Sequence, residues 1–203
     1  MEEGNGFMEV KNKIMISNIY LELTRACNLS CPHCLRGNAD NDSFMTFEQI
    51  DRILDNFTIC NHITMGGGEP CLAKEQMFYL FDAIRKRQEN NISTWVSSVG
   101  MITNGTILDD EIVEKLNSLT EVLLKHIKEV KKNTKVVQVL ISNDKYHDNN
   151  PQDALKWYKE RVNSHIRVGY NKLNKEKDEI GECKNSIKNG IKARKKYGIA
   201  DLQ

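Results

Sequence analysis

This sequence of 203 residues has no long uninterrupted apolar run. A membrane-spanning helix needs about 20 predominantly apolar residues, so no transmembrane helix and no membrane partner are expected. The N-terminal segment MEEGNGFMEVKNK also lacks the apolar core of a secretory signal peptide. Both absences favour a cytoplasmic protein, in which cysteine thiols stay reduced.

Net charge is small as well, at +1 near neutral pH. This balance gives no electrostatic reason to expect a nucleic-acid partner. The charge is uneven, however, because residues 171–203 carry nine Lys or Arg against five Asp or Glu. Such a run is typical of a solvated helix face, and a basic docking surface for an acidic peptide or nucleotide is the alternative.

The sequence contains no low-complexity linker, and no composition shift marks a second domain. Its length and its 39% hydrophobic content suffice for one sizeable core. We therefore predict a single domain over residues 1–203, with a recognisable core at about 18–170 and a basic helical tail at 171–203.

Strand and helix patterns alternate along the chain. This alternation predicts an α/β fold with parallel strands and crossover helices. Five units and a candidate sixth strand favour an open, partial (β/α)6-type TIM barrel whose sixth unit is truncated or incomplete. Strands are expected at 18–24, 62–65, within 94–102, at 135–142, 166–168 and 198–203, and helices at 46–57 (N-cap Thr46), 74–88, 109–131, 151–162 and 184–196.

Three cysteines, Cys27, Cys31 and Cys34, lie within eight residues directly after the first predicted strand. Close-set cysteines in a reducing compartment indicate a metal or catalytic site. A [4Fe–4S] cluster normally takes one thiolate per iron. Three thiolates therefore leave one iron free for a ligand that is not part of the protein.

A structural zinc module is the alternative use of these cysteines, with His33 or His62 as the fourth ligand. Zinc sites of this kind usually pair two short arms, and the sequence has no second C-x2-C or H-x3-H arm. Zinc without iron or sulfide after anaerobic reconstitution would favour this hypothesis.

The C-x3-C-x2-C spacing, together with the downstream segment Gly67-Gly68-Glu69-Pro70, resembles the radical S-adenosylmethionine (SAM) enzymes. The resemblance covers about residues 20–147. It implies a [4Fe–4S] cluster on the three cysteines and SAM on the open iron. In this family, the reduced cluster cleaves SAM to a 5′-deoxyadenosyl radical that abstracts hydrogen from a substrate. An electron donor such as flavodoxin or ferredoxin is implied as a partner.

By the same resemblance, Glu69 is expected to accept a hydrogen bond from the ammonium group of SAM. Gly67 and Gly68 are expected to let the backbone approach the ligand closely. His33 is expected to contact the cofactor along the adenine.

Polar residues after the third and fourth predicted strands complete the expected cofactor site. Thr103 and Asn104 resemble a turn that holds the carboxylate or ribose, although Asn-Gly is also a common turn former. Ser142 and Asp144 resemble ribose-binding or carboxylate-binding positions, with ordinary loop caps as the alternative. Weaker candidates are Tyr146 and His147 on the same loop, Arg167 as a partner for a carboxylate, and Cys60, Cys71 and Cys183, whose roles stay open.

The loop Cys31-Pro-His-Cys34-Leu-Arg-Gly37 resembles small bacterial members of the family and peptide-modifying enzymes, which implies a peptide substrate. A small purine-like or nucleotide substrate is the alternative. The incomplete sixth unit motivates a third hypothesis, a cluster-binding and SAM-binding protein that has lost activity or depends on a partner to shield its cavity.

Overall fold

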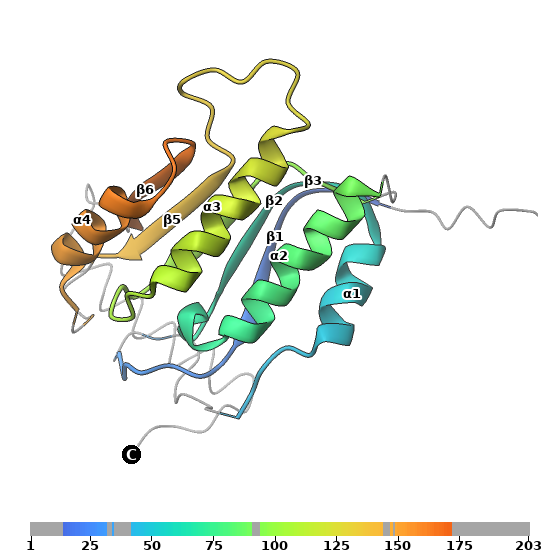
Figure 1. Ribbon diagram of the computed structural model, residues 1–203. Helices are drawn as coiled ribbons and strands as arrows, with labels where there is room; N and C mark the ends of the chain where they lie inside the picture. Colours follow the sequence, from blue (N-terminus) through green and yellow to red (C-terminus); the bar gives the residue numbers. More distant parts are fainter. Residues whose placement is uncertain are drawn as a thin grey trace, which may run out of the picture.

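The computed structural model describes residues 14–31, 34, 42–90, 94–143, 147 and 149–171. Strands and helices alternate along them, as the sequence predicts (Figure 1). The elements are β1 (Ile14–Thr24), α1 (Phe47–Asp55), β2 (Phe57–Gly67), the short 3-10 helix η1 (Pro70–Leu72), α2 (Lys74–Glu89), β3 (Trp95–Val96), β4 (Val99–Thr103), α3 (Asp110–Leu124), β5 (Val137–Ser142), α4 (Pro151–Arg161) and β6 (Ile166–Asn171).

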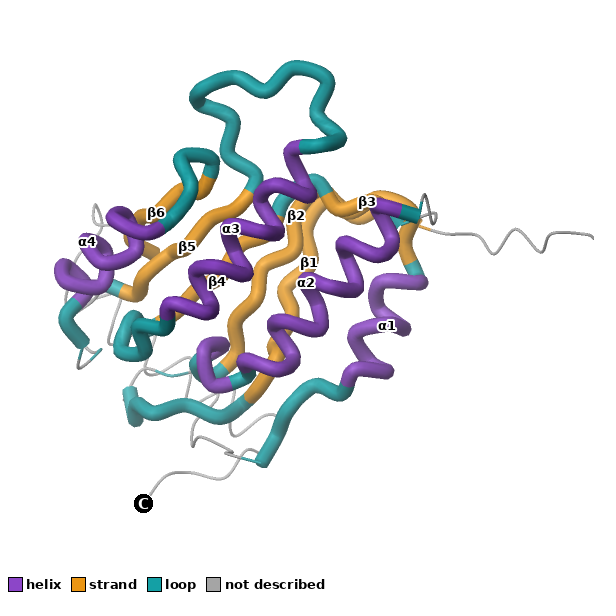
Figure 2. Tube along the Cα trace, viewed as in Figure 1, coloured by secondary structure: helices purple, strands orange, loops and turns teal. Residues whose placement is uncertain are grey.

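The strands form one parallel sheet in the order β1-β2-β4-β5-β6, with β3 paired to β2. Helices α1, α2 and α3 lie side by side across one face of this sheet (Figure 2). This confirms the predicted α/β class, and the open order, with β1 and β6 outermost among the described strands, is consistent with a partial barrel. Because all paired strands run the same way, their carboxyl ends meet at one edge, where sites of such folds gather.

Successive side chains of a strand point to opposite faces of the sheet, so one face packs into the core and the other does not. In β5, Val137, Val139 and Ile141 are buried in the hydrophobic core, whereas Gln138 and Leu140 are only half-buried. We call the face that carries Gln138, and its neighbours Gly100 on β4 and Arg167 on β6, the inner face. No described helix is both long and apolar enough to span a membrane.

The predicted helix boundaries agree with the structure to within two residues except in α3. Helix α1 ends at Asp55 instead of residue 57, because Phe57 begins β2. Thr46 caps α1 as predicted, because its hydroxyl accepts from Gln49 N–H (3.2 Å) and its N–H donates to the Gln49 side chain (2.8 Å). Helix α3 ends at Leu124 instead of residue 131. Its buried positions stop at Leu123. The charged segment that follows is mostly exposed, and only Ile127 in residues 125–131 is partly buried against the core.

The predicted strand within 94–102 is divided into β3 and β4. Between them, Ser97 N–H donates to the Cys60 carbonyl (3.0 Å) and Ile63 N–H donates to the Ser98 carbonyl (3.1 Å), so the chain follows β2 throughout. The expected helix at 184–196 and strand at 198–203 lie outside the described residues.

Candidate cofactor site

The three loop cysteines lie just beyond β1, at the carboxyl edge of the sheet. None of the three forms a disulfide, and all three are half-buried. Burial raises the pKa of the Cys27 thiol; a hydrogen bond from the Leu29 backbone opposes this, while nearby Glu69 and Cys34 add to it. Within the described residues, no group of three or more His, Cys, Asp or Glu side chains is arranged to hold a metal ion. The chemistry of the donor set, three soft thiols on one loop, fits an iron–sulfur cluster.

Gly67, Gly68 and Glu69 form a turn at the end of β2, which we call the glycine turn. This turn is hydrogen-bonded to the chain that leads into the cysteine loop. Gly68 N–H donates to the Thr24 carbonyl and Glu69 N–H to the Ala26 carbonyl, both at 2.8 Å. A Cβ on Gly67 would lie 2.1 Å from the Thr24 oxygen, and one on Gly68 would lie 2.0 Å from the Ala26 oxygen. Gly67 also has φ of +130°, which favours glycine. The close approach that these glycines allow is therefore to the protein's own backbone.

Tyr20 covers this turn from β1. Its hydroxyl accepts a hydrogen bond from Gly67 N–H at 3.0 Å. A Cβ on Gly66 would lie 1.9 Å from the same hydroxyl oxygen, so the tyrosine occupies the space above that glycine. Tyr20 is not predictable from the sequence as part of this turn, because an aromatic residue on a strand carries no local sign of a distant contact.

Glu69 is completely buried. Its carboxylate accepts hydrogen bonds from the Thr103 hydroxyl (2.8 Å), Asn104 N–H (2.7 Å) and Cys71 N–H (3.0 Å). Charge-assisted bonds of this kind hold the ends of β2 and β4 together. The side chain therefore has a structural role in this conformation, and its expected contact with the ammonium group of SAM stays a prediction.

Asparagines join the cysteine loop to the turn after β4. The Asn104 amide donates to the Asn28 side-chain oxygen (2.9 Å), and the Asn28 amide donates to the Thr106 hydroxyl (2.7 Å). Thr106 N–H donates back to the Asn104 side chain (2.9 Å). Asn149 then donates to the backbone carbonyls of Asn104 (2.6 Å) and Ser142 (2.9 Å). These bonds join the ends of β1, β4 and β5.

The structure thus brings the predicted Thr103, Asn104 and Ser142 to the edge that carries the cysteine loop. Asn28, Thr106 and Asn149 join them without having been predicted, although the position of Asn28 beside Cys27 was a usable signal. The predicted residues that lie outside the described part are His33, Asp144, Tyr146 and Cys183.

Cys71 lies below the glycine turn, in a buried polar layer. Its sulfur is 3.8 Å from the Thr103 hydroxyl oxygen. Burial, with the neighbouring Glu69 charge, raises the pKa of the Cys71 thiol well above its ordinary value. Burial likewise raises the pKa of Tyr158, which lies close to this thiol. Both groups are therefore neutral side chains that support the turn from beneath.

His62 does not join the cysteines. Its Nδ1 is 2.7 Å from the Ser98 hydroxyl oxygen, and its Nε2 is 2.9 Å from the Gln138 amide nitrogen. Gly66 lies four residues further along β2, which is about 13 Å of strand. The described geometry therefore gives no support to a zinc site that uses His62.

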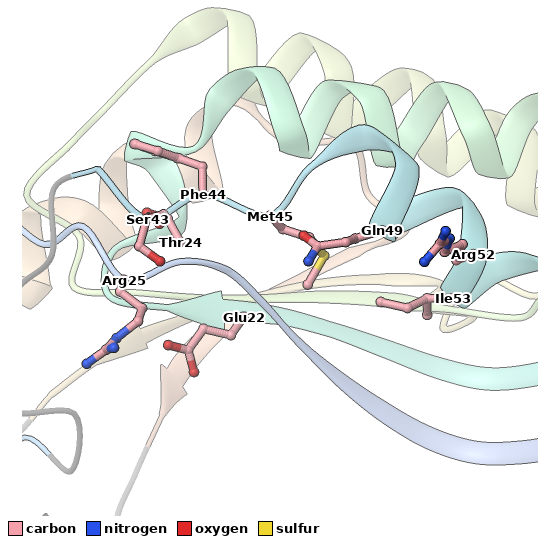
Figure 3. Close-up of a pocket in the computed structure, with 9 residues that line it drawn as sticks. All are labelled: Glu22, Thr24, Arg25, Ser43, Phe44, Met45, Gln49, Arg52 and Ile53. Atoms are coloured by element: carbon pink, nitrogen blue, oxygen red, sulfur yellow. The ribbon is translucent and has the colours of Figure 1, made fainter. Parts of the chain in front are cut away.

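A hollow of about 520 Å³ lies beside the entry to the cysteine loop (Figure 3). Its wall combines β1, the segment that leads into α1, and α1 itself. Charged and apolar side chains both line it. The lining residues are Glu22, Thr24, Arg25, Ser43, Phe44, Met45, Gln49, Arg52 and Ile53.

The sequence profile of the Radical SAM superfamily matches residues 21–183. A probable GTP 3′,8-cyclase of Pyrococcus horikoshii is 32% identical over 96 residues, which are 46% of this chain and 28% of that protein. The GTP 3′,8-cyclase of Clostridium perfringens strain SM101 is 28% identical over 194 residues, which are 88% of this chain and 54% of that protein. The chain thus spans only part of the length of these relatives.

A solved structure described as native anSMEcpe with bound AdoMet and Kp18Cys peptide shares the fold. Its TM-score is 0.54 at 19% identity, over 76% of this chain and 42% of that one. The cysteine loop and the glycine turn both lie within the matched residues 21–183. The chain therefore belongs to the radical SAM superfamily, a family of enzymes that use a [4Fe–4S] cluster and S-adenosylmethionine.

Proposed function

We propose that this chain uses Cys27, Cys31 and Cys34 to hold a [4Fe–4S] cluster for radical chemistry on a peptide. One observation carries the proposal. The three cysteines, none of them in a disulfide, follow β1 directly, and the backbone at Thr24 and Ala26, just before them, is hydrogen-bonded to the glycine turn after β2. The cysteine loop therefore lies beside a fixed turn, which supports its use as a cluster-binding loop.

A [4Fe–4S] cluster held by Cys27, Cys31 and Cys34 would supply one-electron reductive cleavage of SAM, with the electron coming from an external donor such as flavodoxin or ferredoxin. The chain's own residues hold the loops around this site in fixed positions. Glu69 and Asn104 fix the turn after β2 against the turn after β4. Asn28 fixes the cysteine loop against that second turn. Gly67, Gly68, Thr103, Asn104 and Ser142 stay candidates for cofactor contacts, as do His33 and Asp144.

The hollow beside β1 supports a peptide as the substrate. Its volume of about 520 Å³ lies in the usual range of ligand sites, about 300–1,000 Å³. Its apolar residues Phe44 and Met45 and its charged residues Glu22, Arg25 and Arg52 offer contacts of both kinds that peptide side chains make. The structural neighbour anSMEcpe was solved with a peptide. A small nucleotide is the second candidate, because the relatives from Pyrococcus horikoshii and Clostridium perfringens are described as a probable GTP 3′,8-cyclase and a GTP 3′,8-cyclase.

The test is anaerobic reconstitution with iron and sulfide, followed by SAM and a strong reductant. Mass spectrometry then measures 5′-deoxyadenosine. We expect the native chain to form it and Cys31→Ala to lose both the cluster and the product. Cys60→Ser is the matched control, because it changes a cysteine outside the loop.

The outcomes separate the hypotheses. A full iron complement in Cys31→Ala would refute the assigned ligand set. An intact cluster without 5′-deoxyadenosine in the native chain would favour a partner-dependent or inactive protein. Formation of 5′-deoxyadenosine would justify testing candidate peptides and nucleotides, with the modified product as the readout.

A further inference from the structure

A second pocket, of about 140 Å³, lies away from the cysteine loop. Its polar lining comes from Ser98, from Lys135 just before β5, and from strands β2, β5 and β6. The side chains that matter here are His62, Ser98, Lys135, Gln138 and Arg167. No Asp or Glu lines it, so its formal charge, from Lys135 and Arg167, is positive.

Strand register brings these side chains together on the inner face. Gly100 on β4 pairs with Gln138 on β5, and Gln138 pairs with Arg167 on β6. Gly100 leaves the space between β2 and β5 open, because a Cβ there would lie 2.8 Å from His62 Nε2 and 3.1 Å from the Gln138 side chain. His62 and Gln138 can therefore meet across the glycine.

The hydrogens that Ser98 and Gln138 have available determine the donor and the acceptor in each of their contacts with His62. The Ser98 hydroxyl donates to the Asn61 carbonyl at 2.8 Å, so its oxygen must accept from His62 Nδ1–H. Burial lowers the pKa of His62, which favours the neutral ring. His62 Nε2 then accepts one amide hydrogen of Gln138, and the second hydrogen of that amide stays available.

The cations add further donors. Arg167 is exposed and forms no hydrogen bond or ion pair with any residue in the described part of the chain. Lys135 donates to the Ser164 carbonyl, which uses one of its three ammonium hydrogens. The pocket therefore offers donors and positive charge, and its histidine is already satisfied as a neutral anchor.

We propose that this inner-face pocket binds an oxyanion of the substrate, a carboxylate or a phosphate, through Arg167, Gln138 and Lys135. Its volume is about four to five times the share of one water in the liquid, about 30 Å³, which suits a group of that size. Gln138 lies four residues before the carboxyl end of β5, about 13 Å of strand. The pocket therefore lies at a distance from the cysteine loop. From this position it can hold a substrate by an end that does not react.

That the anion belongs to the substrate rests on the proposed function, whereas anion binding itself does not. The test therefore uses the full chain without iron or SAM. Inorganic phosphate and acetate are titrated separately at constant ionic strength with chloride as the balancing salt, and amide shifts of Gly100 and Gln138 are followed by NMR. Arg167→Gln is the test variant, and Lys132→Gln, which removes an exposed positive charge outside the pocket, is the matched control.

We expect saturable shifts in the native chain and in Lys132→Gln, with affinity at least about tenfold weaker in Arg167→Gln, as loss of a charge-assisted bond implies. Tighter acetate binding would indicate a carboxylate-bearing substrate, and tighter phosphate binding a phosphorylated one. Absence of saturation, or equal affinity in Arg167→Gln and the native chain, would overturn the proposal. Neither result depends on 5′-deoxyadenosine formation, so failure of anion binding and failure of the proposed function are distinguishable.

Discussion

The carboxylate of Glu69 accepts a hydrogen bond from the backbone N–H of Asn104 at 2.7 Å. The two residues follow β2 and β4, which are neighbours in the sheet although η1, α2 and β3 separate them along the chain. Through Asn104 the same contact reaches Asn28 in the cysteine loop. A buried charge thus connects three loops at the carboxyl edge of the sheet.

Glu69→Ala should destabilise the fold strongly. It leaves three buried donors without an acceptor, and each such group costs about 1–3 kcal/mol. We expect the free energy of unfolding to fall by roughly 3 kcal/mol or more in urea titrations. Glu69→Gln keeps one acceptor oxygen and should lose less. Glu114→Ala, at an exposed position on α3, should change stability by less than about 0.5 kcal/mol. A small effect of Glu69→Ala would contradict the role assigned to the carboxylate.

Gly66→Ala and Gly68→Ala should both destabilise the protein, but only the first should be rescued. The obstacle at Gly66 is the Tyr20 side chain, whereas the obstacle at Gly68 is the Ala26 backbone. Adding Tyr20→Ala should therefore cost less stability in the Gly66→Ala background than in the native one. In the Gly68→Ala background it should cost its usual amount. Thermal unfolding of the single and double variants measures this coupling, and equal coupling in both pairs would disprove the explanation.

Asn28→Ala should loosen the cysteine loop more than it affects the fold. Asn28 is exposed, so the change in unfolding free energy should stay below about 1 kcal/mol. The lost bonds to Asn104 and Thr106 should make a reconstituted cluster more accessible to chelators. Iron release to a chelator, followed by absorbance, should be several times faster than in Asn133→Ala, an exposed asparagine elsewhere. Equal release rates would remove Asn28 from the site.

Asp109 should make stability depend on pH in the acid range. It caps α3 through Glu111 N–H (2.8 Å) and Ile112 N–H (3.3 Å), and Lys74 lies 2.8 Å from its carboxylate. The Lys74 ammonium holds the pKa of Asp109 below its ordinary value of 3.8. A lowered pKa stabilises the fold above that value, and the contribution disappears as pH falls through the folded-state pKa.

Asp109→Asn keeps the capping oxygen and removes the charge. The stability difference between the native chain and this variant should therefore be constant from about pH 5 to about pH 7 and shrink below pH 3.8. Urea titrations across this range provide the measurement. A difference that does not change with pH would show that the ion pair with Lys74 contributes nothing.

The sequence by itself determined the order and type of the elements, because apolar periodicity and helix caps are local. Thr46 caps α1 as expected, and the charged residues after Leu124 could have shortened the prediction for α3. The candidate ligands Cys27, Cys31 and Cys34 could likewise be recognised from the sequence. They lie on one loop, so their spacing in the sequence already brings them together.

Tertiary structure alone decided what the residues around the cysteines do. Asn28 and Asn104 are 76 positions apart, and Glu69 and Thr103 are 34 apart. Their contacts depend on the pairing of β2 with β4, which no local pattern encodes. The same pairing places Gly100 between His62 and Gln138. A side chain's residue type is local, but its hydrogen-bond partners are set by which strands become neighbours, and only the folded sheet fixes that.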